Sequence, residues 1–331
     1  MKIYILLVGF FVFVSACNAS DEYKVTGCGG LKEVLSSFDI PAPNENSLQH
    51  ANEGNAKAQF EIAWYSYVKK NYKEAEYWSL KSAEQGHVGS QLLLGILYSK
   101  GILGKIDIKS AADWYLKAAN LGNAQAQFSL GIIEDNQGNF KEALHWYQKA
   151  ADQDHILAQS VLGKLYVSGT AVPKNFIKAG EWFKKAAENG YHDAQFNLGV
   201  MYDNGEGFLQ NHTVAAEWYR RAAAQGHGDA QYNLGTMYAD GIGVAKDSVL
   251  AYVLFDLAAS NKDFESNNSA IVDRDFIQKL LNISQLEEAL LLSKNTQRPV
   301  IGPTEEKHCS AGLYHIPTIS KTGSVHKIKN P

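Results

Sequence analysis

The chain has 331 residues, of which 45% are hydrophobic, 11% aromatic and 20% charged, with 7 prolines and 28 glycines. These proportions are typical of a globular protein and exclude a disordered or collagen-like chain. The 31 lysines and arginines stand against 35 aspartates and glutamates, a formal charge of -4, so the positive excess of a nucleic-acid-binding protein is missing. We expect no nucleic-acid partner.

Residues 1–16 have the pattern of a signal peptide. The positive start Met1-Lys2 precedes an uncharged, mostly apolar run over residues 3–14, and small residues occupy positions 15 and 16. Such a run is too short for a membrane-spanning helix, which needs roughly 20 residues. The pattern therefore predicts export from the cytoplasm.

The end of this segment, Val14-Ser15-Ala16-Cys17, resembles the lipobox of bacterial lipoproteins. The resemblance implies cleavage before Cys17, acylation of that cysteine and permanent membrane anchoring. In the sorting rule of such lipoproteins an aspartate in the next position retains the protein on the inner membrane, so Asn18 indicates the outer membrane, with the protein facing the periplasm. The alternatives are a simple secretory signal with an incidental cysteine, or an uncleaved anchor.

Residues 17–57 are expected to form a linker with capping helices. We predict short helices at 31–38 and 47–53, separated by the breaker Pro41-Ala42-Pro43. Cys28 of this segment and Cys309 near the C-terminus can pair in an oxidising periplasm. They flank opposite ends of a repeat array, so a disulfide and two unpaired thiols both remain open.

Residues 58–259 contain six copies of one pattern, in steps of 32 or 36 residues. Each copy begins with Ala-Gln or, once, Ser-Gln, and the glutamines are Gln59, Gln91, Gln127, Gln159, Gln195 and Gln231. Leu-Gly follows within four residues in five copies. Five copies also share a tryptophan column, made up of Trp78, Trp114, Trp146, Trp182 and Trp218.

Both halves of each copy have helical periodicity. Ala194, Leu198 and Tyr202 share one helix face, for example. A residue suited to end a helix in the left-handed conformation lies four residues before each Ala-Gln, a glycine in five copies and Asp154 in the sixth. We expect the tryptophans to fill the space between units. One helix pair cannot bury its apolar side alone, so neighbouring copies must stack.

This pattern is similar to the Sel1-like repeat, a relative of the tetratricopeptide repeat, whose unit reads A-Q-x-x-L-G-x-x-Y, then G-x-G-V, then A-x-x-W-Y-x-K-A-A-x-x-G. The longer copies carry its glycine loop, as in Gly241-Ile242-Gly243-Val244. The resemblance implies an all-α, right-handed superhelical solenoid of about six helix-turn-helix repeats with capping helices at both ends. It also implies a scaffold that binds a protein or peptide on its concave face.

The concave face is expected on the side of the first helix opposite Ala194, Leu198 and Tyr202. We predict ligand-binding positions there at Phe128, Ile132, Lys164, Phe196, Asn197, Val200, Tyr232, Asn233 and Thr236. Aromatic residues along a groove can hold an extended or helical peptide. The alternative is that the rings pack against the neighbouring unit, with Lys164, Asn197 and Asn233 facing solvent.

The segment after the array, residues 260–295, is predicted to cap it with helices at 270–281 and 285–292. Ser284 and Glu287 have the spacing of a capping box. Residues 296–331 hold 4 of the 7 prolines and show no helical period, so we expect an irregular tail.

The sequence has no C-x-x-C, H-E-x-x-H or phosphate-loop motif, and its 10 histidines are scattered. We expect no metal, no cofactor and no catalytic residue. The four histidines next to the helix-ending column are interpreted as polar loop residues: His87, His155, His192 and His227.

One pattern suggests an enzyme. Ser66-x-x-Lys69, Ser266-x-Asn268 and Lys321-Thr322-Gly323 occur in the order used by penicillin-binding proteins and serine β-lactamases, which need a nucleophile and two lysines. A cell-wall or β-lactam-binding enzyme is therefore one alternative, and a surface factor contacting host cells is another. The preferred hypothesis is a lipid-anchored scaffold of the bacterial cell envelope that mediates protein–protein interactions.

Overall fold

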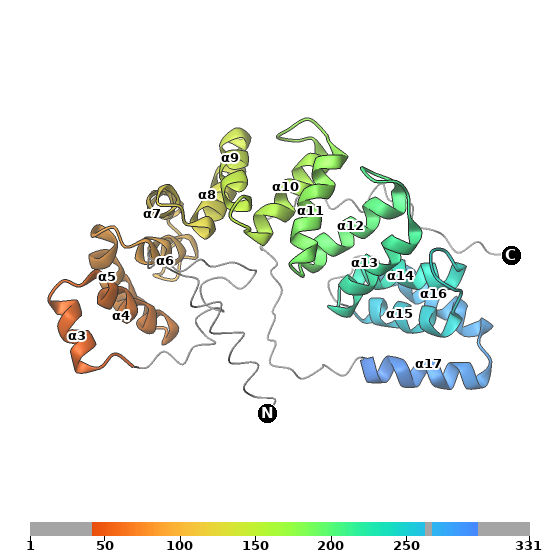
Figure 1. Cartoon of the computed structure of the whole chain (residues 1–331). Coiled ribbons are helices and arrows are strands. Elements are labelled where there is room, and N and C mark those ends of the chain that lie inside the picture. The colour runs from red at the N-terminus through yellow and green to blue at the C-terminus, as the bar shows by residue number, and fades with distance from the viewer. Residues whose placement is uncertain (1–41, 262–266, 297–331) are drawn as a thin grey trace, which may run out of the picture. The chain divides into compact units, whose positions relative to one another are not determined.

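The computed structural model describes residues 42–261 and 267–296, which contain fifteen helices and no strands. The signal peptide, Cys17, Cys28, the helix expected at 31–38, Cys309 and the tail lie outside these residues. The helices are α3 (Glu45–Asn52), α4 (Ala56–Val68), α5 (Tyr72–Glu84), α6 (Val88–Ser99), α7 (Ile108–Asn120), α8 (Ala124–Asn136), α9 (Phe140–Ala151), α10 (Ile156–Ser168), α11 (Phe176–Glu188), α12 (His192–Asn204), α13 (His212–Ala224), α14 (Gly228–Asp240), α15 (Ser248–Ser260), α16 (Asn267–Leu280) and α17 (Ile283–Thr296) (Figure 1).

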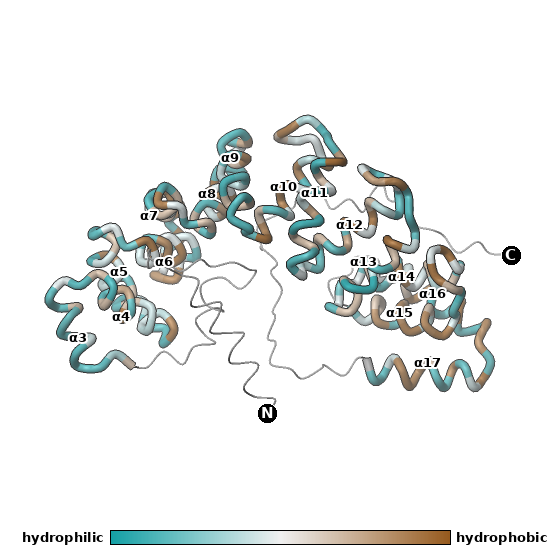
Figure 2. Tube along the Cα trace, in the orientation of Figure 1, coloured by the Kyte–Doolittle hydropathy of each residue, from teal (hydrophilic) through white to brown (hydrophobic). Residues whose placement is uncertain are grey.

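These helices form an all-α solenoid, as predicted. The chain divides into two compact units, Met1–Ala150 and Ala151–Pro331. Within each unit a helix packs mainly against the next one along the chain, as α4 does on α5 and α12 on α13. Hydrophobic and hydrophilic residues are mixed along the helices, as expected where one side of a helix is buried (Figure 2). None of the described helices is long and apolar enough to span a bilayer.

The Ala-Gln dipeptide joins consecutive helices. In every repeat the glutamine Nε2 donates a hydrogen bond to the carbonyl oxygen eight residues earlier, near the end of the preceding helix: Ala51, Ala83, Ala119, Ala151, Ala187 and Ala223. The last carbonyls of a helix lack partners within that helix. The glutamine column therefore satisfies one of them while holding the next helix in place.

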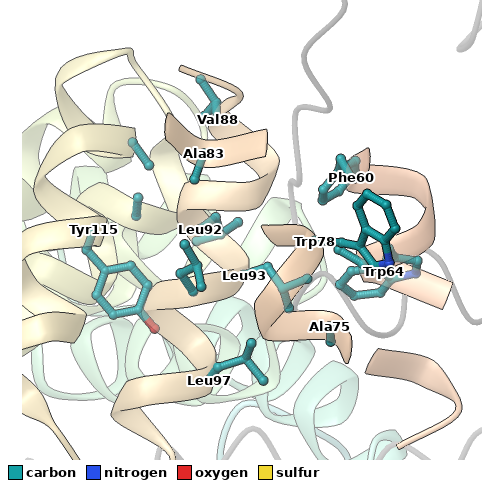
Figure 3. Packing of buried hydrophobic residues seen from close by; sticks show 14 of the residues in the cluster. Phe60, Trp64, Ala75, Trp78, Ala83, Val88, Leu92, Leu93, Leu97 and Tyr115 are labelled. Carbon is teal, nitrogen blue, oxygen red and sulfur yellow. The ribbon is translucent and has the colours of Figure 1, made fainter. Parts of the chain in front are cut away.

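The Leu-Gly glycine allows a close contact inside each repeat. A Cβ at Gly163 would lie 2.6 Å from the ring of Phe183, and the corresponding glycines meet Tyr115, Tyr147, Tyr219 and Phe255 in the same way. Phe183 is completely buried. Figure 3 shows one such ring, Tyr115 of α7, beside Leu92 and Leu97 of α6. The repeat core thus forms around an aromatic ring resting on a glycine.

This arrangement corrects the role expected for the tryptophans. Trp78 is buried, but Trp114, Trp146, Trp182 and Trp218 are only half-buried, and the ring in the centre of the repeat belongs to the following residue. A lysine or arginine three residues later lies over each indole; Lys185 Nζ, for example, is 4.3 Å from the ring centroid of Trp182. The tryptophans therefore cover the core at its edge.

The helix-ending residues have the predicted left-handed backbone. Gly54, for example, has φ of 99°, and Asp154, the non-glycine member of this column, has φ of 60°. The residue that follows caps the next helix. Asn55, His87, Asn123, His155 and His227 each accept a hydrogen bond from the backbone N–H three residues on. The interpretation of these histidines as polar loop residues missed this role.

Helices α16 and α17 close the second unit by packing on α15. Arg274 of α16 and Ser293 of α17 both hydrogen-bond to Asp256 of α15. The expected capping box at Ser284 and Glu287 is wrong. Asn282 and Gln285 instead exchange hydrogen bonds of 3.0 and 3.1 Å, because the helix begins two residues earlier than predicted.

Candidate functional site

Most residues predicted to line the concave groove are buried. Phe128 of the first unit is buried and Ile132 is half-buried. In the second unit the buried positions are Phe196, Val200, Tyr232 and Thr236, and the half-buried ones are Lys164 and Asn233. Phe196 and Val200 pack in one cluster with Leu234 and Met237 of α14. Phe196 and Val200 thus pack against the neighbouring repeat, which was the alternative to lining a groove.

Asn197 requires a correction, because it was expected to face solvent. Its side chain is buried, and its Nδ2 donates a 2.6 Å hydrogen bond to the backbone oxygen of Asp193. All residues from 194 to 201 of α12 are buried, since α11, α13 and α14 pack around this helix. The accessible residues of α12 lie at its two ends, 192–193 and 202–204.

A polar cluster occupies the start of α12. It consists of Lys164 of α10, Tyr191, His192 and Asp193 at the beginning of α12, and His227 before α14; we call it the Asp193 cluster. The carboxylate is at its centre. Its Oδ2 accepts a 2.9 Å hydrogen bond from the hydroxyl of Tyr191 and lies 4.0 Å from Lys164 Nζ. Its Oδ1 lies 2.9 Å from His192 Nδ1 and 3.8 Å from His227 Nε2.

The cluster contains an accessible edge and a buried edge. The side chains of Lys164, His192 and Asp193 are 20%, 33% and 31% exposed, so a second molecule can reach them. His227 is 13% exposed and stacks on the ring of Phe196 at 4.5 Å between centroids. The cluster therefore combines accessible charged side chains with the less accessible, stacked rings of His227 and Phe196.

Electrostatics favour an ionised carboxylate and a neutral His227. Burial alone would raise the pKa of Asp193, but the hydrogen bond from His192 and the nearby Lys164 outweigh it and hold this pKa well below its usual range. Burial lowers the pKa of His227 to about 4, although the negative charge of Asp193 opposes this change. At neutral pH the formal charges of Asp193 and Lys164 balance each other.

Comparison with known proteins identifies the repeat. The model of the Sel1 repeat family matches residues 56–87, 88–123, 124–155, 156–191, 192–227 and 228–263. The chain belongs to the Sel1 repeat family. Proteins of this family generally mediate protein–protein interactions, and their solenoid is typically a non-enzymatic scaffold. No curated protein matches the chain significantly.

The solved structures that resemble the chain include the following two with Sel1 repeats. One is a protective antigen of uropathogenic Escherichia coli with an SLR fold, at 34% identity and a TM-score of 0.68. The match covers 76% of this chain and 55% of the antigen, so the chain spans about half of that relative's length. The other is a Sel1 repeat protein from Oxalobacter formigenes, at 32% identity and a TM-score of 0.59, with 70% of this chain and 96% of the other covered.

The Asp193 cluster lies where the Sel1 pattern of this chain changes. Tyr191 occupies the capping column but forms no side-chain cap, unlike Asn55, His87, Asn123, His155 and His227. The next position is apolar or glycine in the other five repeats and is His192 here. Local departures from a structural pattern are often found at functional sites. Sequence analysis missed His192, Asp193 and His227 as a site, although this change in the column was its visible signal.

The motifs that suggested an enzyme gain no support from the described residues. Ser66 is buried, and its hydroxyl donates a 3.0 Å hydrogen bond to Glu74 Oε2. That hydrogen bond gives Ser66 a structural role in the packing of α4 against α5. Ser266 and Lys321-Thr322-Gly323 lie outside the described residues.

Proposed function

We propose that this Sel1 repeat chain is a lipid-anchored scaffold of the bacterial cell envelope. It binds a protein partner through the half-buried polar side chains of its first helices, which remain partly accessible. The observation that carries the proposal is the Asp193 cluster, together with Asn233 on the following first helix. The buried aromatic rings that were predicted to line the groove are not part of the proposed binding surface. Anchoring and envelope location rest on the signal-peptide and lipobox resemblance at residues 1–17.

Lys164 is the residue on which a partner would depend most. Its own helix contains no acidic residue, and its contact with Asp193 is long for an ion pair, at 4.0 Å. A partially exposed pair of this length contributes little stability, so an acidic group of a partner can compete for the lysine. The proposed partner surface therefore presents a carboxylate to Lys164 and a polar group to Asn233.

The test is crosslinking in intact cells followed by capture of the chain. We expect Lys164→Glu combined with Asn233→Ala to remove the partners captured by the wild type while circular dichroism shows an unchanged helical spectrum. Lys184→Glu is the matched control, because Lys184 is an exposed lysine on the second helix α11. Identical partners for the double variant and the wild type would refute the proposed surface.

A second candidate is a factor exposed on the cell surface. The observation that favours it is the similarity to the protective antigen of uropathogenic Escherichia coli. Protease treatment of intact cells distinguishes the two locations. A surface protein is digested, whereas one that faces the periplasm is digested only after the outer membrane is opened.

A further inference from the structure

His192, Asp193 and His227 bring three potential metal-binding atoms within 4.8 Å of one another. We propose that these side chains bind a divalent transition-metal ion of the zinc type. Two imidazoles and one carboxylate are a donor set that such ions accept, whereas Mg²⁺ and Ca²⁺ prefer oxygen ligands alone. The proposal concerns the same cluster as the proposed partner surface but does not depend on a partner.

The distances suit a small ion. In a tetrahedral zinc site with metal–ligand bonds of roughly 2 Å, the ligand atoms lie about 3.4 Å apart. Asp193 Oδ1 lies 2.9 Å from His192 Nδ1 and 3.8 Å from His227 Nε2, so these two separations bracket that value. The two imidazoles offer ligand atoms within 4.8 Å of each other. The side chains must still rotate to bring these three atoms to the metal–ligand distances of one ion. Three protein ligands leave a fourth position for water or for a group of a partner.

The other carboxylate oxygen is already held in a way typical of a metal ligand. Tyr191 donates a 2.9 Å hydrogen bond to Asp193 Oδ2, which turns Oδ1 toward the two imidazoles. Metal-binding carboxylates and histidines are usually oriented by such a second contact. Tyr191 does not cap α12 with its side chain, unlike the residues at this position in the other repeats. The hydrogen bond to Asp193 gives a reason for a tyrosine there.

Three features weaken the binding. His192 Nδ1 donates a hydrogen bond to Asp193, so an ion at that nitrogen requires the ring proton to move to Nε2. His227 Nδ1 accepts a 3.3 Å hydrogen bond from the backbone N–H of Ala230, so the proton of the neutral ring is on Nε2. An ion bound at Nε2 shifts this proton to Nδ1 and breaks one long capping bond. Lys164, 4.0 Å from Asp193, adds a repulsive positive charge. We therefore expect weaker binding than in a preformed structural zinc site.

Helix capping alone does not account for the cluster. His87 and His155 cap their helices without a histidine or aspartate in the two positions that follow, which are Val88-Gly89 and Ile156-Leu157. His227 can be explained as a third cap of this kind. His192 has no such structural role, because it is the first residue of α12 and the other repeats place an apolar residue or glycine there.

The test is calorimetric titration of the purified, chelator-treated protein with zinc chloride. We expect one saturable site per chain and a rise in the unfolding temperature. His227→Asn should weaken binding by at least roughly 10-fold, and His192→Ala should do the same. Asn55 and Asn123 cap the equivalent helices α4 and α8, so His227→Asn removes the metal ligand while keeping a capping side chain.

His155→Asn is the matched control, because it makes the same exchange at a cap outside the cluster, and it should leave the affinity unchanged. Lys164→Met should tighten binding several-fold by removing the opposing charge. Either of two results overturns the proposal. One is the absence of a saturable zinc signal, and the other is equal zinc affinity in the wild type, His192→Ala and His227→Asn, which would place the ion elsewhere in the chain.

Discussion

The aromatic ring that rests on glycine should contribute more to stability than the tryptophan beside it. Phe183 is completely buried, and Phe→Ala in such a position costs about 3–5 kcal/mol. Trp182 is half-buried beneath Lys185, so Trp182→Ala should cost roughly half as much, about 2 kcal/mol. For the roughly 250 residues that the structure describes, each kcal/mol lowers the unfolding midpoint by about 2 °C, which predicts a drop of about 6–10 °C for Phe183→Ala.

Gly163 provides the internal check. A Cβ at Gly163 would lie 2.6 Å from the ring of Phe183, so Gly163→Ala alone should destabilise the protein by overpacking. In the Phe183→Ala background the added methyl group has space, and its cost should fall by about 0.5–3 kcal/mol.

The assay is urea and thermal unfolding of the four members of this cycle and of Trp182→Ala, both followed by circular dichroism. If Gly163→Ala costs the same with and without Phe183, the ring and the glycine do not interact as described. A larger loss for Trp182→Ala than for Phe183→Ala would show instead that the tryptophan column forms the centre of the repeat.

Three further predictions follow from other features. Gln85 and Gln225 donate hydrogen bonds to the side-chain oxygens of Gln59 and Gln195 in their repeats, but the buried Gln91 Oε1 has no such donor. Leu121 occupies the equivalent donor position, so Leu121→Gln should raise the free energy of unfolding by about 0.5–1.5 kcal/mol; an unchanged urea midpoint would contradict this. Burial lowers the pKa of His155 to about 4, below its value of roughly 6.5 in the unfolded chain, so its contribution to stability is present above pH 6.5 and declines by about 3 kcal/mol as the pH falls to 4. His155→Asn should remove that part of the pH dependence, and parallel urea curves at every pH for variant and wild type would refute it. Cys17→Ser should abolish metabolic labelling with an acyl-chain analogue, whereas equal labelling of both proteins would exclude lipidation at Cys17.

The site illustrates what a linear pattern can and cannot reveal. Lys164 was recognisable as a charged residue in an otherwise largely apolar column, and it does lie beside the cluster. Asp193 and His227 are 34 positions apart, and no local spacing rule relates them. They meet because consecutive first helices stack and bring their N-terminal ends together. Asn197 was misplaced because helices on several sides of α12 bury all its residues from 194 to 201.

The amino-acid sequence by itself determined the architecture, because each repeated column encodes a short-range contact that recurs in every copy. A glutamine reaches a carbonyl eight residues back, and a left-handed residue ends a helix four residues before the dipeptide. Only the tertiary structure decided that Phe183 rather than Trp182 is central, and that His192 and Asp193 are accessible while Phe196 is not. The exposure of a residue depends on the rotation of its helix about its own axis. That rotation results from packing against helices on several sides at once, so the periodicity of one helix cannot specify it.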